Sequence, residues 1–334
     1  MSNPVSAIAG RLSLRPPQRE SLEILARLLE IIPLKKERDL PSLLEAIKAQ
    51  VPAFVDFERE FPSFCFSLAT GVGKTRLMGA FITYLHVAKG IRHFFVLAPN
   101  LTIYDKLIAD FTPNSRKYVF QGIGEFASNP PEIITGDNYE SSRAARKGKD
   151  DLFDPIQINI FNISKINSEV RGGQAPRIKR LSEYIGDSYF NYLANLDDLV
   201  LIMDESHRYR ATQGARAINE LNPVLGLELT ATPKIQSGQS AEDFKNLVYR
   251  YTLADALRDG FVKEPAVVTR ENFDPTPYKE RPDELDRIKL EDGVRLHEAT
   301  KVEIETWARQ NGQRIVKPFM LVIARDTTHA GQLL

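Results

Sequence analysis

The stretch that decides the fold is Phe64-Cys65-Phe66-Ser67-Leu68, followed at once by Ala69-Thr70-Gly71-Val72-Gly73-Lys74-Thr75. The first five residues predict a short buried strand, and residues 76–89 predict a helix. Glycines between them let backbone N–H groups turn toward an anion, and the start of a helix favours negative charge. Lysine and hydroxyl side chains then suit nucleotide phosphates and Mg²⁺. The sequence therefore predicts a phosphate loop formed by Thr70, Gly71, Gly73, Lys74 and Thr75.

On both sides of this loop, segments of helical and strand periodicity alternate. Strands are predicted at 93–98, 132–135, 156–161, 199–203, 224–230, 264–269 and 318–324, and helices at 17–31, 42–50, 76–89, 101–111, 178–193, 254–259 and 287–310. Such alternation is typical of an α/β fold with a parallel sheet and helices on both faces. We expect an N-terminal helical segment at 1–62, an ATP-binding lobe at 63–270, and a linker with the beginning of a second lobe at 271–334.

Two carboxylates, Asp204 and Glu205, end an apolar strand, and Ser206 and His207 follow them. Ligands of parallel α/β sheets bind at such strand ends. Asp204 suits Mg²⁺, held through water, and Glu205 suits the polarisation of an attacking water. A solvated acidic turn would give the same pattern. The phosphate loop upstream favours the catalytic reading, with Lys74, Asp204 and Glu205 as the catalytic residues and Thr75 and Asp204 as Mg²⁺ ligands.

A third motif, Thr230-Ala231-Thr232, also ends an apolar strand and precedes Pro233. Small hydroxyl side chains there can hydrogen-bond the Asp204–Glu205 turn. With His207, they are expected to relay the state of the nucleotide to a nucleic-acid groove. A polar strand end is the alternative for this triplet.

In this order, the motifs resemble those of the first lobe of superfamily 2 DEAD/DEAH-type helicases. The similarity is greater to the Res subunits of type III restriction enzymes. It extends from about residue 14 to the end of the chain and rests on residues 69–75, 94–104, 131–139, 158–165, 204–207, 230–232 and 318–326. The resemblance implies a RecA-like (P-loop NTPase) lobe that binds Mg·ATP and moves on DNA, with duplex DNA favoured, and a methyltransferase or specificity subunit as a partner.

The resemblance also implies roles for residues outside the three motifs. Gln18, within Leu14-Arg15-Pro16-Pro17-Gln18, would read the adenine edge, because an amide both donates and accepts. Nucleic-acid phosphates would be contacted by Asn100, Thr102, Asn162 and Lys165. Helix-start, helix-cap or surface roles remain open for all five residues.

The sequence departs from the family pattern in three respects. The first glycine of the general phosphate-loop motif would fall at Leu68, and the acidic motif is Asp-Glu-Ser-His. The second lobe should supply an arginine that stabilises charge on the γ-phosphate, which is worth about 10³–10⁵ in rate. We expect the chain to end inside that lobe and the isolated 334 residues to hydrolyse ATP weakly or not at all. A truncated, non-catalytic ATP- and DNA-binding module is therefore the alternative function, and a P-loop small-molecule kinase is a third class, disfavoured by the strand-end motifs.

Charge and cysteine content set few limits on function. Lys plus Arg and Asp plus Glu both number 44, so the net charge of zero neither supports nor excludes nucleic-acid binding. Cys65 is the single cysteine, which excludes an intramolecular disulfide and fits a reducing compartment. No stretch approaches the length of a membrane span or a signal peptide, so a cytoplasmic location without membrane contact is expected.

Overall fold

The computed structural model describes residues 4–139, 156–162, 187–210, 216, 218–237, 240–264 and 266–333. The chain divides into two compact units, Met1–Glu264 (unit 1) and Pro265–Leu334 (unit 2). All three strand-end motifs belong to unit 1. The division at 264/265 falls inside a segment predicted as a strand, and the assignment of residues 1–62, 63–270 and 271–334 to separate domains stays a prediction.

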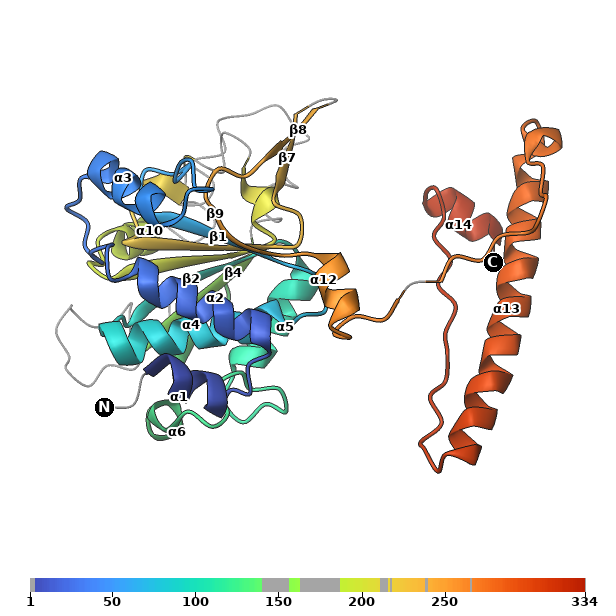
Figure 1. Cartoon of the computed structure of the whole chain (residues 1–334), viewed down its shortest axis with the longest axis horizontal. Helices are drawn as coiled ribbons and strands as arrows, with labels where there is room; N and C mark the ends of the chain where they lie inside the picture. Colours follow the sequence, from blue (N-terminus) through green and yellow to red (C-terminus); the bar gives the residue numbers. More distant parts are fainter. Residues whose placement is uncertain are drawn as a thin grey trace. The chain divides into compact units, whose positions relative to one another are not determined.

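Unit 1 is built on a parallel sheet (Figure 1), which confirms the predicted α/β class. The described residues form seven strands in the order β3-β4-β2-β5-β6-β1-β9. Every neighbouring pair runs parallel. The strands are β1 Ser63–Leu68, β2 His93–Ala98, β3 Glu132–Thr135, β4 Gln157–Asn162, β5 Leu199–Asp204, β6 Leu225–Thr230 and β9 Leu247–Tyr251.

The central strands are apolar because both faces of the sheet are covered. Every residue of β1, β4, β5 and β6 is buried, which is typical of a parallel sheet between two helical layers. One layer of helices covers the face of the sheet on which α4 lies (Figure 1). Its apolar side chains and alternate residues of the strands together form the larger core. The opposite strand faces, including Phe95, Leu201 and Met203, pack against α10. The helices of unit 1 are α1 Pro4–Arg11, α2 Pro16–Leu28, α3 Leu40–Gln50, α4 Lys74–Lys89, α5 Leu101–Phe111, α6 Gly124–Ser128, α10 Asp187–Ala194 and α12 Leu253–Arg258.

Most predicted elements of unit 1 agree with the structure to within two or three residues. Strands β2 and β3 and helix α5 have the predicted bounds. Of the helix predicted at 178–193, only the part from residue 187 lies within the described residues. The elements that were not predicted include α1, α6, strand β9, and the antiparallel hairpin of β7 Lys234–Ser237 and β8 Ser240–Asp243.

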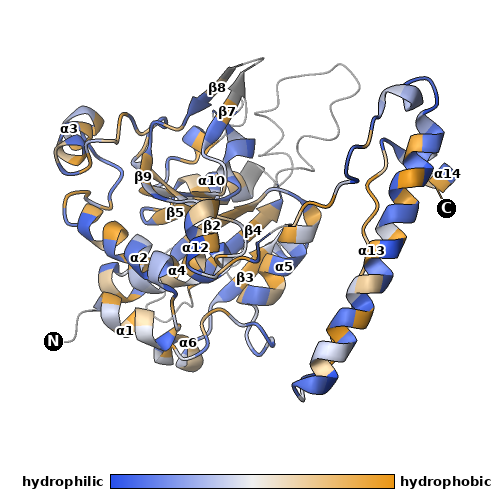
Figure 2. Cartoon of the chain, turned by 45° about the vertical axis from the view of Figure 1, so that its right-hand side comes forward, coloured by the Kyte–Doolittle hydropathy of each residue, from blue (hydrophilic) through white to orange (hydrophobic). Residues whose placement is uncertain are grey.

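Unit 2 contains helix α13 Pro282–Gln310, helix α14 Thr327–Leu333 and a short 3₁₀ turn, η4 Thr276–Tyr278. The strands predicted at 264–269 and 318–324 are wrong for the described residues, where neither segment is a strand. A strand needs a neighbour to pair its backbone groups, and no described strand runs beside these segments. Their apolar side chains are exposed, 88% for Val267 and 85% for Phe319. Figure 2 colours the extended stretch beside α13 as hydrophobic.

Within the described residues, no helix has the length and apolar character that a bilayer crossing requires.

Candidate functional site

The register of the sheet brings the predicted motifs to one edge. Ser67, before the phosphate loop, pairs with Thr230, and Leu229 pairs with Asp204. On the other side of β5, Leu97 pairs with Met203, so the start of α5 also reaches this edge. Because the strands are parallel, their carboxyl ends lie side by side, and the sequence-distant motifs become neighbours.

The phosphate loop has the backbone geometry that its glycines predict. Gly71 and Gly73 have φ of 88° and 102°, in the left-handed region. Gly73 is the N-cap of α4, so Lys74 and Thr75 are the first helical residues. At the other end of the loop, Ala69 N–H donates to the Tyr251 carbonyl of β9 at 3.0 Å. The loop is therefore fixed to a strand on one side and to a helix start on the other.

Two residues of the α2 start, Arg15 and Gln18, orient the peptide planes of the loop. Gln18 Nε2 donates to the carbonyls of Val72 at 3.1 Å and Gly73 at 2.8 Å, and Arg15 Nη1 donates to Gly71 at 3.0 Å. In a trans peptide, the N–H points opposite to the C=O. The N–H groups of Gly73 and Lys74 therefore point away from α2, toward the side where a phosphate would be bound. Because Gln18 Oε1 also accepts from Arg15 N–H at 2.8 Å, both ends of its amide are engaged with the chain's own backbone. Its predicted reading of adenine stays a prediction.

Replacing Gly73 by alanine is expected to destabilise unit 1 more than the same change at Gly90. A Cβ at Gly73 would lie 2.6 Å from Gln18 Nε2, whereas nothing lies within 4 Å at Gly90, which also has positive φ. The left-handed backbone costs about 1–2 kcal/mol for alanine at either site. The Gly73 variant also loses the Gln18 contacts, worth about 1 kcal/mol each. Urea denaturation of both variants measures the difference, and equal costs would contradict this account of the loop.

The catalytic pair predicted from the sequence lies against the loop. Lys74 Nζ is 3.1 Å from Glu205 Oε1, and both side chains are largely shielded from solvent. Glu205 has φ 49°, a left-handed conformation that a glutamate adopts at a cost. This backbone turns the Glu205 carboxylate away from the strand direction of Asp204, whose Oδ1 accepts the Glu205 N–H at 3.1 Å.

The predicted relay residues form a hydrogen-bonded chain from the same glutamate. His207 Nδ1 is 3.6 Å from Glu205 Oε2 and 3.1 Å from Thr230 Oγ1. Thr230 Oγ1 donates to the Thr232 carbonyl at 3.2 Å, so it accepts from the histidine, which places the ring proton on Nδ1. Burial lowers the pKa of His207 below its usual value, although Glu205 opposes this. The structure thus brings Glu205, His207, Thr230 and Thr232 together, while their coupling role stays a prediction.

Asp204 carries its charge at a cost in the metal-free chain. Burial, and then the neighbouring Glu205 carboxylate, raise the pKa of Asp204 to about 6, although Lys74 and Lys106 lower it. Because this pKa lies above the unfolded value of about 3.9, the folded chain holds the proton more tightly. Folding stability therefore falls as the pH rises from about 4 to 6, and the loss persists at pH 7.

Asp204→Asn is accordingly expected to stabilise the metal-free chain at pH 7 by about 1–3 kcal/mol. The amide oxygen can still accept the Glu205 N–H, so the turn is preserved. The gain should disappear at about pH 3, where the wild-type carboxyl is protonated in both states. Denaturation in the presence of EDTA at the two pH values measures it, with the exposed Asp105→Asn as a control within about 0.5 kcal/mol of wild type. A less stable Asn variant at pH 7 would refute the assignment.

A buried ion cluster lies behind the acidic turn. Glu228 of β6 is fully buried, accepts from Arg59 Nε at 3.2 Å and Ser63 Oγ at 2.9 Å, and pairs with Arg210. Arg210 follows directly after the 3₁₀ turn η3 Ser206–Tyr209, and its guanidinium stacks 3.8 Å from the Phe244 ring. The cluster therefore ties the turn that carries Glu205 to the centre of the sheet.

The residues expected to contact nucleic acid lie in different settings. Asn100 caps α5, its side chain accepting from Ile103 N–H at 2.9 Å, and Thr102 is exposed on the first turn. Asn162, at the end of β4, is 1% exposed. Lys165 lies outside the described residues. The cap role left open for Asn100 is confirmed, and nucleic-acid contact by these residues stays a prediction.

Sequence reasoning missed three contributors to the site. Lys106 of α5 donates to Thr75 Oγ1 at 3.1 Å, Arg15 binds the loop carbonyls, and Tyr251 anchors Ala69. No local pattern marks the first and last of these, because each contact joins segments far apart in the chain. Arg15 stands in the Leu14–Gln18 motif, and its proximity to Gln18 was the one available signal.

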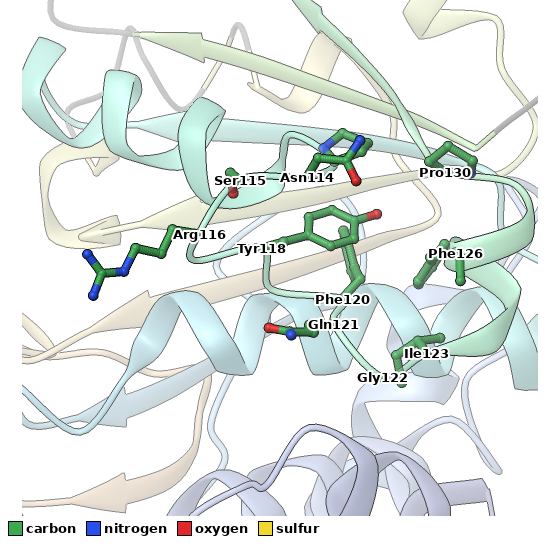
Figure 3. A pocket seen from close by; sticks show the side chains of 12 residues that line it. Asn114, Ser115, Arg116, Tyr118, Phe120, Gln121, Gly122, Ile123, Phe126 and Pro130 are labelled. Atoms are coloured by element: carbon green, nitrogen blue, oxygen red, sulfur yellow. The ribbon is translucent and has the colours of Figure 1, made fainter.

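Away from this edge, unit 1 has a cavity of about 500 Å³ between the end of α5 and α6, with lining residues between 113 and 130. Figure 3 shows the ring of Tyr118 within it and the side chain of Arg116 extending away. Burial raises the pKa of Tyr118 to about 12. None of the predicted site residues lines this cavity.

Taken together, a RecA-like parallel sheet with a phosphate loop and an acidic strand end defines the P-loop class. The model of the family described as "Type III restriction enzyme, res subunit" matches residues 11–235. This is more than half of the chain, so the chain belongs to that family, and unit 1 is a helicase-like motor domain. The match includes Gln18, the phosphate loop, the acidic pair and both threonines of the third motif.

The chain is also similar to individual proteins and solved structures. The chain is 28% identical over 176 residues to the "Probable type III restriction-modification enzyme HindVIP Res subunit" of Haemophilus influenzae, covering 51% of this chain and 29% of that protein. The chain thus spans less than a third of that relative's length. Among solved structures, it is similar to a nuclease-deletion mutant of the Type ISP restriction-modification enzyme LlaGI in complex with a DNA substrate mimic, with 12% identity, coverage of 79% and 24%, and a TM-score of 0.39. The Sulfolobus solfataricus SWI2/SNF2 ATPase core in complex with dsDNA gives 15% identity, coverage of 66% and 32%, and a TM-score of 0.33.

Proposed function

We propose that this chain binds Mg·ATP at the carboxyl edge of the sheet and hydrolyses ATP as a translocase or helicase motor on duplex DNA, in a type III restriction-like system. One observation carries the proposal. Lys74, Thr75, Asp204 and Glu205, from two motifs far apart in sequence, meet at the start of one helix, with Lys74 Nζ 3.1 Å from Glu205 Oε1.

The residues present fit the nucleotide and its metal. A side chain at position 73 would collide with Gln18. Only glycine therefore fits there, and its backbone N–H stays accessible to a phosphate. Among the described residues, no group of three or more His, Cys, Asp or Glu side chains is arranged to hold a metal. The Thr75 hydroxyl and the Asp204 carboxylate are oxygen donors of the kind that Mg²⁺ takes together with phosphate oxygens and water. When bound, Mg²⁺ neutralises charge on the phosphates.

The chain's own groups then have separate tasks. The N–H groups of Gly73 and Lys74 and the Lys74 ammonium hold the phosphates, which requires Lys74 to leave its pair with Glu205. The freed Glu205 carboxylate accepts a proton from the attacking water. His207 contacts both Glu205 and Thr230, so a shift of the glutamate is felt at the third motif. We further propose that residues 271–334 are a linker and the beginning of a second lobe.

The test measures nucleotide binding and steady-state ATP hydrolysis by the chain, with duplex DNA, single-stranded DNA, RNA or no nucleic acid. Lys74→Ala is expected to abolish binding, because it removes the ammonium that stands at the start of α4 and pairs with Glu205. Turnover stimulated by duplex DNA would support the whole proposal. Binding without turnover under any condition would identify an ATP-binding module, and binding unaffected by Lys74→Ala would refute the site.

A further inference from the structure

The corner between α4, α5 and β5 contains the positively charged side chain of Lys106. Lys106 Nζ donates to Thr75 Oγ1 at 3.1 Å and lies 3.6 Å from Asp110 Oδ2, one helical turn further along α5. Its charge also acts on Asp204 across the same corner. One ammonium therefore stands among a hydroxyl and two carboxylates, of which the hydroxyl and one carboxylate are the groups assigned above to Mg²⁺.

Charge balance explains why a lysine stands there. Asp110 and Asp204 are 6% and 7% exposed, and the Glu205 side chain is 22% exposed. Anions so shielded are costly unless a positive charge compensates them. In unit 1, Lys74 compensates Glu205 and acts more strongly than Lys106 on Asp204, while Lys106 compensates Asp110 and donates to the Thr75 oxygen.

We propose that Lys106 is a resident counter-ion of the Mg²⁺ site, which holds the corner in the metal-free chain and moves aside when the metal arrives. The inference rests on the proposed function. The Thr75 oxygen that accepts from Lys106 is the one assigned above to Mg²⁺, so the two cations compete for a place beside it. Asp110 offers the ammonium a second position, because residues four apart on a helix are neighbours. Lys106 is 54% exposed and free to make this move.

If the two cations compete, removing the Lys106 charge should have opposite effects on nucleotide binding without and with Mg²⁺. Without Mg²⁺, the Lys106 charge attracts the nucleotide phosphates, so Lys106→Met should weaken nucleotide binding. With Mg²⁺, the same change removes the competitor, so the Mg²⁺ concentration at half-maximal binding should fall. Since a partly exposed ion pair contributes up to about 1 kcal/mol, each effect should be about two- to fivefold.

The experiment titrates a fluorescent ADP analogue into the full chain, first in EDTA and then at fixed nucleotide with rising Mg²⁺. Lys106→Arg keeps the charge and should stay close to wild type. Lys48→Met is the matched control, because Lys48 is also a helix lysine paired with an acid one turn away, on α3. It should bind as wild type under both conditions.

The outcomes separate this inference from the proposed function. A Lys106→Met chain with the Mg²⁺ requirement of wild type, or a higher one, overturns the counter-ion role, while the proposed function stands if Lys74→Ala abolishes binding. Weakening by the same factor with and without Mg²⁺ would mean that Lys106 binds phosphate only, and it too overturns the inference. If the wild-type chain binds no nucleotide, the proposed function fails first and this inference fails with it.

Discussion

Glu205→Gln is expected to slow ATP hydrolysis by about 10²–10⁴-fold while Mg·ATP stays bound, because the amide has the shape of the carboxylate but cannot accept a proton. The left-handed backbone at φ 49° costs the same for either side chain, so the turn should persist. Loss of the 3.1 Å pair with Lys74 frees that ammonium for the phosphates. Nucleotide affinity is therefore expected to be unchanged or higher.

The measurement pairs single-turnover hydrolysis with equilibrium binding on the same preparation. Glu45→Gln, an exposed carboxylate on α3, is the control and should match wild type in both. Less than a tenfold loss of rate would place the proton acceptor elsewhere. Loss of binding together with rate would mean that Glu205 maintains the loop rather than acting on water.

Glu228→Ala should give the largest loss of stability, about 3–5 kcal/mol, because it leaves the buried Arg59 guanidinium without its carboxylate and leaves Arg210 paired with Glu58 alone. Arg59 and Arg210 side chains are 1% and 5% exposed, so water cannot take its place. At about 2–4 °C for each kcal/mol, the melting temperature should fall by roughly 10 °C. Thermal and urea unfolding measure the loss, and Glu23→Ala, which breaks an exposed pair with Arg19, should cost under about 1 kcal/mol.

The pH dependence of a second substitution at this position, Glu228→Gln, provides a further check. Burial alone would raise the pKa of Glu228, but Arg59 and Arg210 lower it below its usual value. A lowered pKa means that the carboxylate stabilises the fold above its unfolded pKa of about 4.3 and that this contribution is lost as the pH falls through the folded value. The difference between Glu228→Gln and wild type should therefore shrink in acid. A difference independent of pH would show that packing, and not charge, dominates the cluster.

The sequence was most informative where one short segment determines its own structure. Strands such as β5 are continuous apolar runs that predict a buried strand. The glycines of the phosphate loop predict the left-handed backbone that the structure shows. Strand β9, Leu247-Val-Tyr-Arg-Tyr, was missed because polar and aromatic residues interrupt its pattern at the edge of the sheet. The prediction for residues 318–324 was wrong in the opposite sense. Their apolar composition predicts a strand, but no described strand pairs with them.

The site shows the same division between local and distant information. Motif order placed Lys74, Asp204, Glu205 and Thr230 at one edge because parallel strand ends coincide. It could not show which side chains touch, because Lys106 meets Thr75, and Arg210 meets Glu228, only through the packing of α5 and η3. Gln18 illustrates the limit within a motif: its position was predicted, and its bonds to the Val72 and Gly73 carbonyls were not.

The position of β1 between β6 and β9 has a consequence for the growing polypeptide on the ribosome. Strand β1 is synthesised before both of its neighbour strands, which end only at Thr230 and Tyr251, and Ala69 is held by the latter. At 5–20 residues per second, the nascent β1 waits roughly 10–40 s with both edges open. Open apolar edges are sites of mispairing, so this interval is when chaperones matter most. For the same reason, a fragment cut at residue 235, where the family match ends, would lack β9 and should yield insoluble protein.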